Sequence, residues 1–306
     1  MKRSLVVAIL LMGLTMTPVV ASTAVVVTIK PVHALVAGVM RGIAEPKLLV
    51  RGSSSPHTYA LPPSDVAALY AAAVFFRVSP QLEPFTYKIT RALPQEVQVV
   101  SLVEAPGLEL LAVRRGPAFE RDGAHAEHAG TVDLVDGHAW LDPENAKVMV
   151  AYIAEILSRK DPAHSAAFRS NARDLQHRLE LLRRELEQTL TPIADRPYVV
   201  FHDAMHYFEQ RFGLNAVGSI SVSPEISPSA ARLIELRRKV RIAGAQCAFA
   251  EPQFGMALVS TVVEGTGVRV GMLDPEAINL APGPDLYFTL LRNLAADLTR
   301  CLTMPA

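Results

Sequence analysis

The chain of 306 residues is half hydrophobic, and its 30 Lys and Arg residues equal its 30 Asp and Glu residues in number. This length is sufficient for two lobes that each bury a core of their own. The zero formal charge gives no sign of a basic surface for nucleic acid or anionic lipid, so we expect no nucleic-acid partner.

The N-terminal segment has the pattern of a secretory signal peptide. Lys2 and Arg3 precede an apolar run over residues 5–16, and the small residues Ala21 and Ala24 follow it. We assign residues 1–23 to a signal peptide, with cleavage expected after Ala21 or Ala24. The apolar run is too short to span a bilayer comfortably. No Cys follows it closely, so we expect an exported protein without a lipid anchor.

Strands and helices alternate through residues 24–160, which we assign to an N-terminal lobe. Runs of β-branched and aromatic residues predict strands, and the apolar spacing between them predicts helices. The expected strands are 25–29, 47–50, 74–78 and 97–103, and the expected helices are 33–42, 64–73 and 82–93. This alternation is typical of a parallel sheet with helices on its faces. The irregular stretch 106–137 reads as a loop, and long loops in compact domains are often functional.

Residues 161–191 are predicted to form one long helix between the two halves. Asp161 is a favourable N-cap, and Pro162 suits the first helical position. Apolar residues then recur every three or four positions, at Phe168, Ala172, Leu175, Leu179, Leu182, Leu186 and Leu190. A coiled coil is the alternative interpretation of such a seam. The α/β segments on both sides favour a helix that spans two lobes.

Residues 192–306 repeat the layout of the first half and are assigned to a C-terminal lobe. The expected strands are 198–201, 215–220, 247–250 and 268–272, with helices at 204–212, 229–242, 255–265 and 284–302. We therefore expect an α/β fold of two lobes. Each would contain a parallel sheet flanked by helices, and one long backbone helix would join them.

The chain contains two cysteines, Cys247 and Cys301. An even number of cysteines behind a secretory signal indicates a disulfide, because exported proteins fold in an oxidising compartment. Two separate buried thiols are the alternative.

Chelating side chains fall where the predicted strands or loops end. His57 follows the second strand, His202 directly follows the fifth, and Asp274 follows the last. His138 precedes the helix that leads into the long one. Parallel sheets bind ligands at the carboxyl ends of their strands, so these side chains can meet in the crevice between the lobes. Three imidazoles and one carboxylate suit a tetrahedral Zn²⁺ site.

Neighbouring residues leave parts of this site open. Glu251 ends the seventh strand and fits a partner that orients an imidazole, although Glu251 or water could also be the fourth ligand in place of Asp274. His206 lies four residues after His202 and could chelate with it, but we interpret it as a lobe-surface residue. A secreted zinc-dependent hydrolase is an alternative function, because three histidines with an open position also describe a catalytic zinc site. Neither HExxH nor GxSxG occurs, so we expect no enzyme.

Six segments in this order resemble the zinc-specific solute-binding proteins of ABC transporters, the cluster A-I or cluster 9 metal-binding family. They are Ile29-Lys-Pro31, Ser55-Pro-His57-Thr-Tyr, Pro63-Ser-Asp65, Gly137-His-Ala-Trp-Leu-Asp-Pro143, Phe201-His-Asp203 and Ala250-Glu-Pro-Gln-Phe254. The resemblance covers essentially the whole mature chain. It implies a metal site between two lobes, with His57, His138 and His202 as ligands and Asp274 at the family's carboxylate position. It also implies a disulfide, which part of the zinc group shares.

The resemblance further implies a function and partners. The protein would capture Zn²⁺ in the periplasm and deliver it to an inner-membrane ABC permease. A periplasmic metallochaperone is a second candidate partner, and we expect a monomer. Manganese-binding members of the family, the other alternative, have Glu where this chain has His202. The third imidazole therefore argues for zinc.

This chain departs from the family in two places. Pro56 stands where some zinc members have an acidic residue beside the first ligand. The long His-rich loop of many members is reduced to His125, Glu127 and His128. Whether His125 and His128 capture metal stays open.

Overall fold

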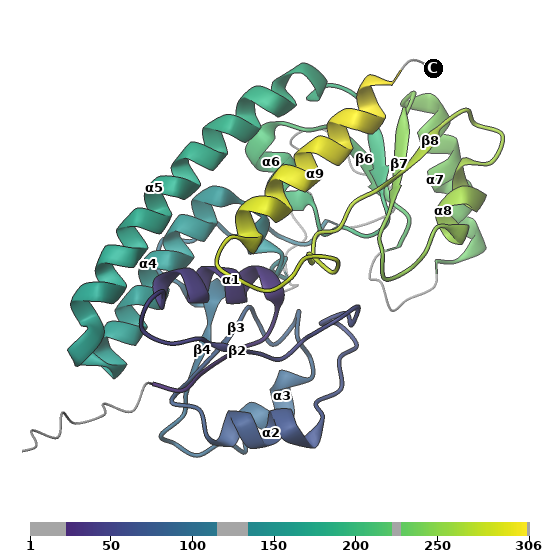
Figure 1. The fold of residues 1–306 in the computed structure, drawn as a ribbon. Coiled ribbons are helices and arrows are strands. Elements are labelled where there is room, and N and C mark those ends of the chain that lie inside the picture. The colour runs from purple at the N-terminus through teal and green to yellow at the C-terminus, as the bar shows by residue number, and fades with distance from the viewer. Residues whose placement is uncertain (1–22, 115–133, 222–227, 305–306) are drawn as a thin grey trace, which may run out of the picture.

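The computed structural model describes residues 23–114, 134–221 and 228–304. Nearly all of the predicted signal peptide, together with His125, Glu127 and His128, lies outside these ranges. Within them the chain forms two four-stranded sheets, with the long helix α5 (Ser165–Leu190) along one side of the molecule (Figure 1). No helix in the described part of the chain is long and apolar enough to cross a membrane.

The N-terminal sheet is parallel throughout and has the strand order β2-β1-β3-β4. Its strands are β1 (Val25–Val27), β2 (Lys47–Leu48), β3 (Val74–Arg77) and β4 (Gln98–Ser101), and its helices are α1 (Lys30–Val39), α2 (Pro63–Tyr70) and α3 (Thr86–Thr90). Valine and phenylalanine side chains of β1 and β3 are buried on both faces, as is usual for a parallel sheet with two covered faces. The helix expected over 82–93 is reduced to α3. Pro84 favours an extended backbone at Glu83 and so opposes an earlier helix start.

The C-terminal sheet repeats this arrangement with the order β6-β5-β7-β8, and it is also parallel. Its strands are β5 (Tyr198–Val200), β6 (Ala216–Ser219), β7 (Cys247–Ala250) and β8 (Arg269–Met272). Its helices are α6 (His206–Phe212), α7 (Ala230–Ile242), α8 (Ala257–Val263) and α9 (Leu286–Thr303). The predicted fold class, two α/β lobes with parallel sheets, is confirmed.

The long helix α5 begins later than the sequence indicated. Residues Pro162–His164 form a 3₁₀ turn, and the side chain of Asp161 accepts a hydrogen bond from the His164 amide at 3.3 Å. The buried residues of α5 are the seven apolar positions of the predicted stripe. Helix α4 (Pro143–Lys160) packs along α5 as its antiparallel neighbour (Figure 1). At 1.5 Å per residue, the 26 residues of α5 extend for about 39 Å.

One apolar core runs from the N-terminal lobe through α5 and α9 into the C-terminal lobe. Gly38 of α1 permits this close packing, because a Cβ there would lie 2.8 Å from Leu175 Cδ2. The lobes are therefore fixed to one another by buried side chains as well as by the chain connection.

A lysine also holds the β8–α9 connection against the N-terminal lobe. Lys30, buried at the start of α1, donates from Nζ to the carbonyl oxygens of Ala277 at 3.2 Å, Ile278 at 2.6 Å and Leu280 at 3.1 Å. Ala277 has φ +57, a conformation that costs a non-glycine residue free energy and persists when its surroundings hold it. Trp140 Nε1 donates to Pro275 O at 3.3 Å. The loop that carries Asp274 is thus attached to the N-terminal lobe at two places.

Cys247 at the start of β7 and Cys301 in α9 form a disulfide across 54 residues of chain. The predicted pairing is confirmed. It attaches the last helix to the centre of the C-terminal sheet.

Candidate metal centre

His57, His138 and His202 converge between the two sheets. His57 lies in the loop after β2, His138 precedes the 3₁₀ turn Ala139–Leu141, and His202 follows β5. Each offers one ring nitrogen, and these three atoms lie within 4.8 Å of one another. The ring centroids are 5.3–5.8 Å apart. His138 and His202 are buried, and His57 is half-buried.

The spacing of the nitrogens suits a small tetrahedral ion. His138 Nε2 and His202 Nε2 are 3.5 Å apart. Two nitrogens that each bind Zn²⁺ at about 2.05 Å in a tetrahedron would be about 3.4 Å apart. These two imidazoles therefore already have the separation of one tetrahedral edge.

Carboxylates hold two of the rings from behind. His138 Nδ1 is 2.7 Å from Asp136 Oδ1, and His202 Nδ1 is 2.5 Å from Glu251 Oε1. An ionised carboxylate can only accept, so each Nδ1 carries the proton and each Nε2 keeps its lone pair for a cation. Glu251 thus orients an imidazole as predicted. Asp136 does the same for His138, although the sequence reasoning gave it no role. Its position two residues before the predicted ligand was the available signal.

Burial and neighbouring charges shift the pKa values of His57 and His202 in opposite directions. Burial, with the neighbouring charges of His138 and His202, lowers the pKa of His57 to about 2. Burial also lowers the pKa of His202, but the charge and hydrogen bond of Glu251 outweigh it, and the pKa is raised. His57 is therefore neutral at pH 7. At His202 the charge of Glu251 strengthens protonation of the ring, so a cation at Nε2 competes with a proton at that atom, while the Nδ1 proton stays hydrogen-bonded to Glu251.

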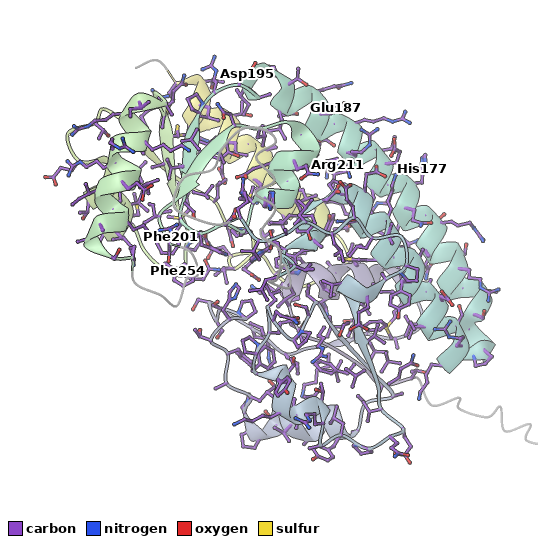
Figure 2. The ribbon with its side chains drawn as sticks, turned by 180° about the vertical axis from the view of Figure 1, so that it is seen from behind. His177, Glu187, Asp195, Phe201, Arg211 and Phe254 are labelled. Atoms are coloured by element: carbon purple, nitrogen blue, oxygen red, sulfur yellow. A yellow bond between two sulfur atoms is a disulfide. The ribbon has the colours of Figure 1, made fainter. Side chains whose placement is uncertain are left out.

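An aromatic wall closes one side of the cluster. Phe201 and Phe254 stack with centroids 4.9 Å apart and an interplanar angle of 8° (Figure 2). Phe254 also lies edge-on to His202 with centroids 6.3 Å apart. This wall limits water access to His202, which strengthens electrostatic interactions in the site.

Asp274 does not join the histidine group. Its Oδ1 accepts the Ile278 amide at 3.0 Å, and its Oδ2 accepts the Asn279 amide at 3.3 Å. The carboxylate therefore caps its own loop in this conformation. Two residues later, Glu276 is buried, and burial raises its pKa to about 8 in spite of the opposing charge of His202. The sequence reasoning missed Glu276, because the sequence carried no signal for its burial.

Glu83 is a second buried acid, and it gives a prediction for pH dependence. Burial raises the pKa of Glu83 from 4.5 to about 7, while its Oε2 accepts the amides of Val78 and Ser79. Between these values the folded state keeps a proton that the unfolded state has released, so stability falls as the pH rises. We expect Glu83→Gln to raise the free energy of unfolding by about 3 kcal/mol at pH 8 and by less than about 0.5 kcal/mol at pH 4.5.

Urea unfolding of the zinc-free protein at both pH values tests this expectation. The exposed residue Glu235 supplies a control, since Glu235→Gln should change stability by less than about 0.5 kcal/mol at either pH. Equal effects of Glu83→Gln at pH 4.5 and pH 8 would contradict the interpretation.

His206 is not the surface residue that the sequence suggested. Its side chain is 16% exposed, and its Nδ1 lies 3.7 Å from Asp136 Oδ2. Tyr207, the next residue, donates its hydroxyl to Asp136 O at 2.8 Å. Since Asp136 also holds His138, the start of α6 supports the second imidazole from behind.

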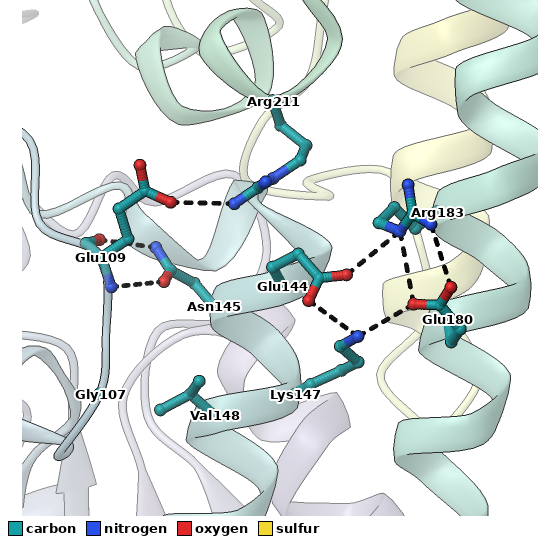
Figure 3. Close-up of a pocket in the computed structure, with 9 residues that line it drawn as sticks. All are labelled: Gly107, Glu109, Glu144, Asn145, Lys147, Val148, Glu180, Arg183 and Arg211. Atoms are coloured by element: carbon teal, nitrogen blue, oxygen red, sulfur yellow. Dashed lines mark hydrogen bonds and ion pairs between the residues drawn. The ribbon is translucent and has the colours of Figure 1, made fainter.

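Ion pairs join α6 and the residues just before it to segments on both sides of His138 in the chain. Arg114 bonds Asp203 and Glu209. Arg211 bonds Asp142. It also bonds Glu109 at the rim of a 540 Å³ cavity beside α4 and α5 (Figure 3). The other charged side chains of that cavity pair with one another, including Glu180 with Lys147 and Arg183 (Figure 3). The paired charges around this cavity therefore link the two lobes with helices α4 and α5.

Solved structures share this architecture. The laminin-binding protein Lmb of Streptococcus agalactiae, described as a bifunctional protein with adhesin and metal transporting activity, is 27% identical with a TM-score of 0.76. The match covers 92% of this chain and 100% of that one. A crystal structure of ZnuA with the same coverage and a TM-score of 0.76 is 24% identical and supports the fold alone. The paired sheets, the long helix and the buried imidazole cluster define a metal-binding solute-binding protein.

The sequence comparisons define the family more narrowly. Residues 25–301 match the family described as ZnuA, zinc-uptake complex component A, periplasmic, and the chain belongs to that family. The high-affinity zinc uptake system protein ZnuA of Brucella suis is 43% identical over 308 residues, which cover 91% of each chain. The protein of the same name from Paracoccus denitrificans is 35% identical, again over 91% of each chain.

Proposed function

We propose that this protein is the periplasmic zinc-binding component of a zinc-uptake system, with His57, His138 and His202 as ligands of one Zn²⁺. The observation that carries the proposal is the three-imidazole cluster, in which Nε2 of His138 and Nε2 of His202 lie 3.5 Å apart. Carboxylates behind these two rings leave both Nε2 atoms as donors. Neutral imidazole is a ligand that zinc favours.

The composition of the cluster favours zinc over manganese. Manganese prefers carboxylate and water ligands, whereas the grouped atoms are all imidazole nitrogens. The hydrolase alternative gains no support, because the similar proteins are named as uptake-system proteins.

We propose Asp274 as the fourth ligand, with Glu251 and water as alternatives. To bind the ion, Asp274 would have to release the amides of Ile278 and Asn279. Glu251 already bonds His202, and it would have to give up that bond. Water would require neither change. A zinc-loaded structure distinguishes the three, since a ligand oxygen lies at about 2.0–2.2 Å from Zn²⁺.

Membership in a zinc-uptake family implies a membrane permease as the partner that receives the metal. We propose that this permease is an inner-membrane ABC transporter, that the exported protein has no lipid anchor, and that it acts as a monomer. A periplasmic metallochaperone is a further proposed partner.

The metal content of the purified protein tests the function. Protein isolated from the periplasm without added metal should contain about one zinc per chain. A tenfold excess of Mn²⁺ should not displace it, since Mn²⁺ precedes Zn²⁺ in the order of divalent affinities. Preferential retention of manganese, or hydrolysis of ester or peptide substrates that depends on the metal, would contradict the proposal.

A further inference from the structure

Helix α7 concentrates positive charge in a chain whose formal charge is zero. Its 13 residues, AARLIELRRKVRI, contain five basic residues and one acidic residue, a net charge of +4. The zero net charge of the whole chain gives no sign of the positive charge on this helix. Because charges beyond about 10 Å are screened at physiological salt, the local charge of α7 decides what its surface attracts.

Several side chains of α7 contact the rest of the C-terminal lobe. Leu236 and Val240 are buried in the core of the C-terminal lobe. Arg232 donates to the carbonyl oxygens of Ile220 and Ser219. Arg237 donates to Glu264 O. These residues attach α7 to the sheet and to the end of α8.

The outer face carries two isoleucines and two arginines. Ile234 is 70% exposed and Ile242 is 75% exposed, the largest values among big hydrophobic residues in the described part of the chain. Arg238 and Arg241 are exposed and make no ion pair with any described residue. Positions 234, 238, 241 and 242 share one side of the helix over about 12 Å. Glu235 is the one acidic residue of α7 and is also exposed.

We propose that this outer face of α7 adsorbs the protein to the surface of an anionic phospholipid bilayer. Guanidinium groups form charge-assisted hydrogen bonds with phosphate. Exposed aliphatic side chains that flank basic residues on a helix enter the boundary between headgroups and acyl chains. Figure 1 shows α7 and α8 on the side of the C-terminal sheet away from α9 and α5. Adsorption through α7 would therefore leave the long helix facing away from the bilayer.

The features of the surface favour lipid over a protein partner. Stable protein interfaces bury about 800 Å² per partner and are centred on aromatic side chains in pockets. The outer face of α7 is convex, and it presents isoleucine and arginine without an aromatic residue. A few basic and aliphatic side chains are sufficient for weak, reversible adsorption to anionic lipid.

Vesicle flotation tests the proposal on the purified exported protein. The probes are vesicles of phosphatidylglycerol and phosphatidylcholine in equal amounts, and vesicles of phosphatidylcholine alone, each at 50 and 500 mM NaCl. We expect binding to the anionic vesicles at 50 mM NaCl, and at least about tenfold weaker binding at 500 mM NaCl or on the neutral vesicles.

Three double variants locate the surface. Arg238→Glu with Arg241→Glu should weaken binding at least about tenfold, and Ile234→Ser with Ile242→Ser about threefold. The matched control is Arg169→Glu with Arg173→Glu, which makes the same charge change at exposed positions of α5 and should change binding less than about twofold. Zinc binding should be unchanged in all three double variants, which would show that they are folded.

Two outcomes would overturn the proposal. One is the absence of binding to either vesicle type, or a loss of anionic-vesicle binding in the α5 control variant as large as the loss in the α7 arginine variant. The other is loss of zinc uptake in cells by the α7 variants without vesicle binding by the original protein, which would assign the face to a protein partner.

Discussion

Replacing His57, His138 or His202 with Ala is expected to weaken zinc binding more than about a hundredfold. Each side chain supplies one ligand atom of the cluster, so its loss removes a metal bond. Asp136→Asn and Glu251→Gln should lower the zinc affinity by about 10–100-fold, because each carboxylate orients a ring nitrogen that binds metal. Competition against a fluorescent zinc chelator gives the affinities.

A matched control comes from another histidine. His177 lies exposed on α5 (Figure 2), and His177→Ala should leave the affinity unchanged. Circular dichroism should show that every variant is folded. Tight binding of one zinc by a variant that lacks His57, His138 and His202 would exclude the proposed site.

Loss of the Cys247–Cys301 disulfide is expected to lower the free energy of unfolding by about 4 kcal/mol. The bond closes a chain segment with a sequence separation of 54, and a loop of this size loses conformational entropy when it is cross-linked in the unfolded state. The variant Cys247→Ala with Cys301→Ala, compared with the oxidised protein by urea unfolding, measures the effect. Reductant should destabilise the oxidised protein by a similar amount.

The double-alanine variant also supplies the control, since reductant should not change its stability. Thiol labelling of the denatured, unreduced protein should find no free cysteine. Two labelled thiols in protein isolated from the periplasm would show that the disulfide does not form there. Zinc affinity should change little, because the disulfide joins β7 to α9 and contains no ligand atom of the cluster.

The sequence by itself determined the elements and the residues that converge. The apolar stripe of α5 matched the buried residues at all seven positions, because burial against one neighbouring core requires the helical period. Strand runs alternating with helices required parallel sheets, and parallel sheets place the carboxyl ends of their strands at one edge. This rule explains why His57 and His202 could be expected to meet from the sequence, whereas His138 precedes a 3₁₀ turn and follows no strand of the two sheets.

The tertiary structure decided which hydrogen-bond or ion-pair partner each polar side chain has. Asp274 follows its strand as expected, but its carboxylate accepts two amides of its own loop. The identity of Asp274 does not indicate where those amides point. His206 is held near Asp136, which comes from a segment about 70 residues away in the chain. The charge of α7 can be counted in the sequence. The exposure of its two isoleucines follows only from the packing of Leu236 and Val240 in the core of the lobe. Hydrophobic periodicity fixes which face of an element is buried, whereas hydrogen bonds between distant segments depend on their relative placement, which the periodicity does not encode.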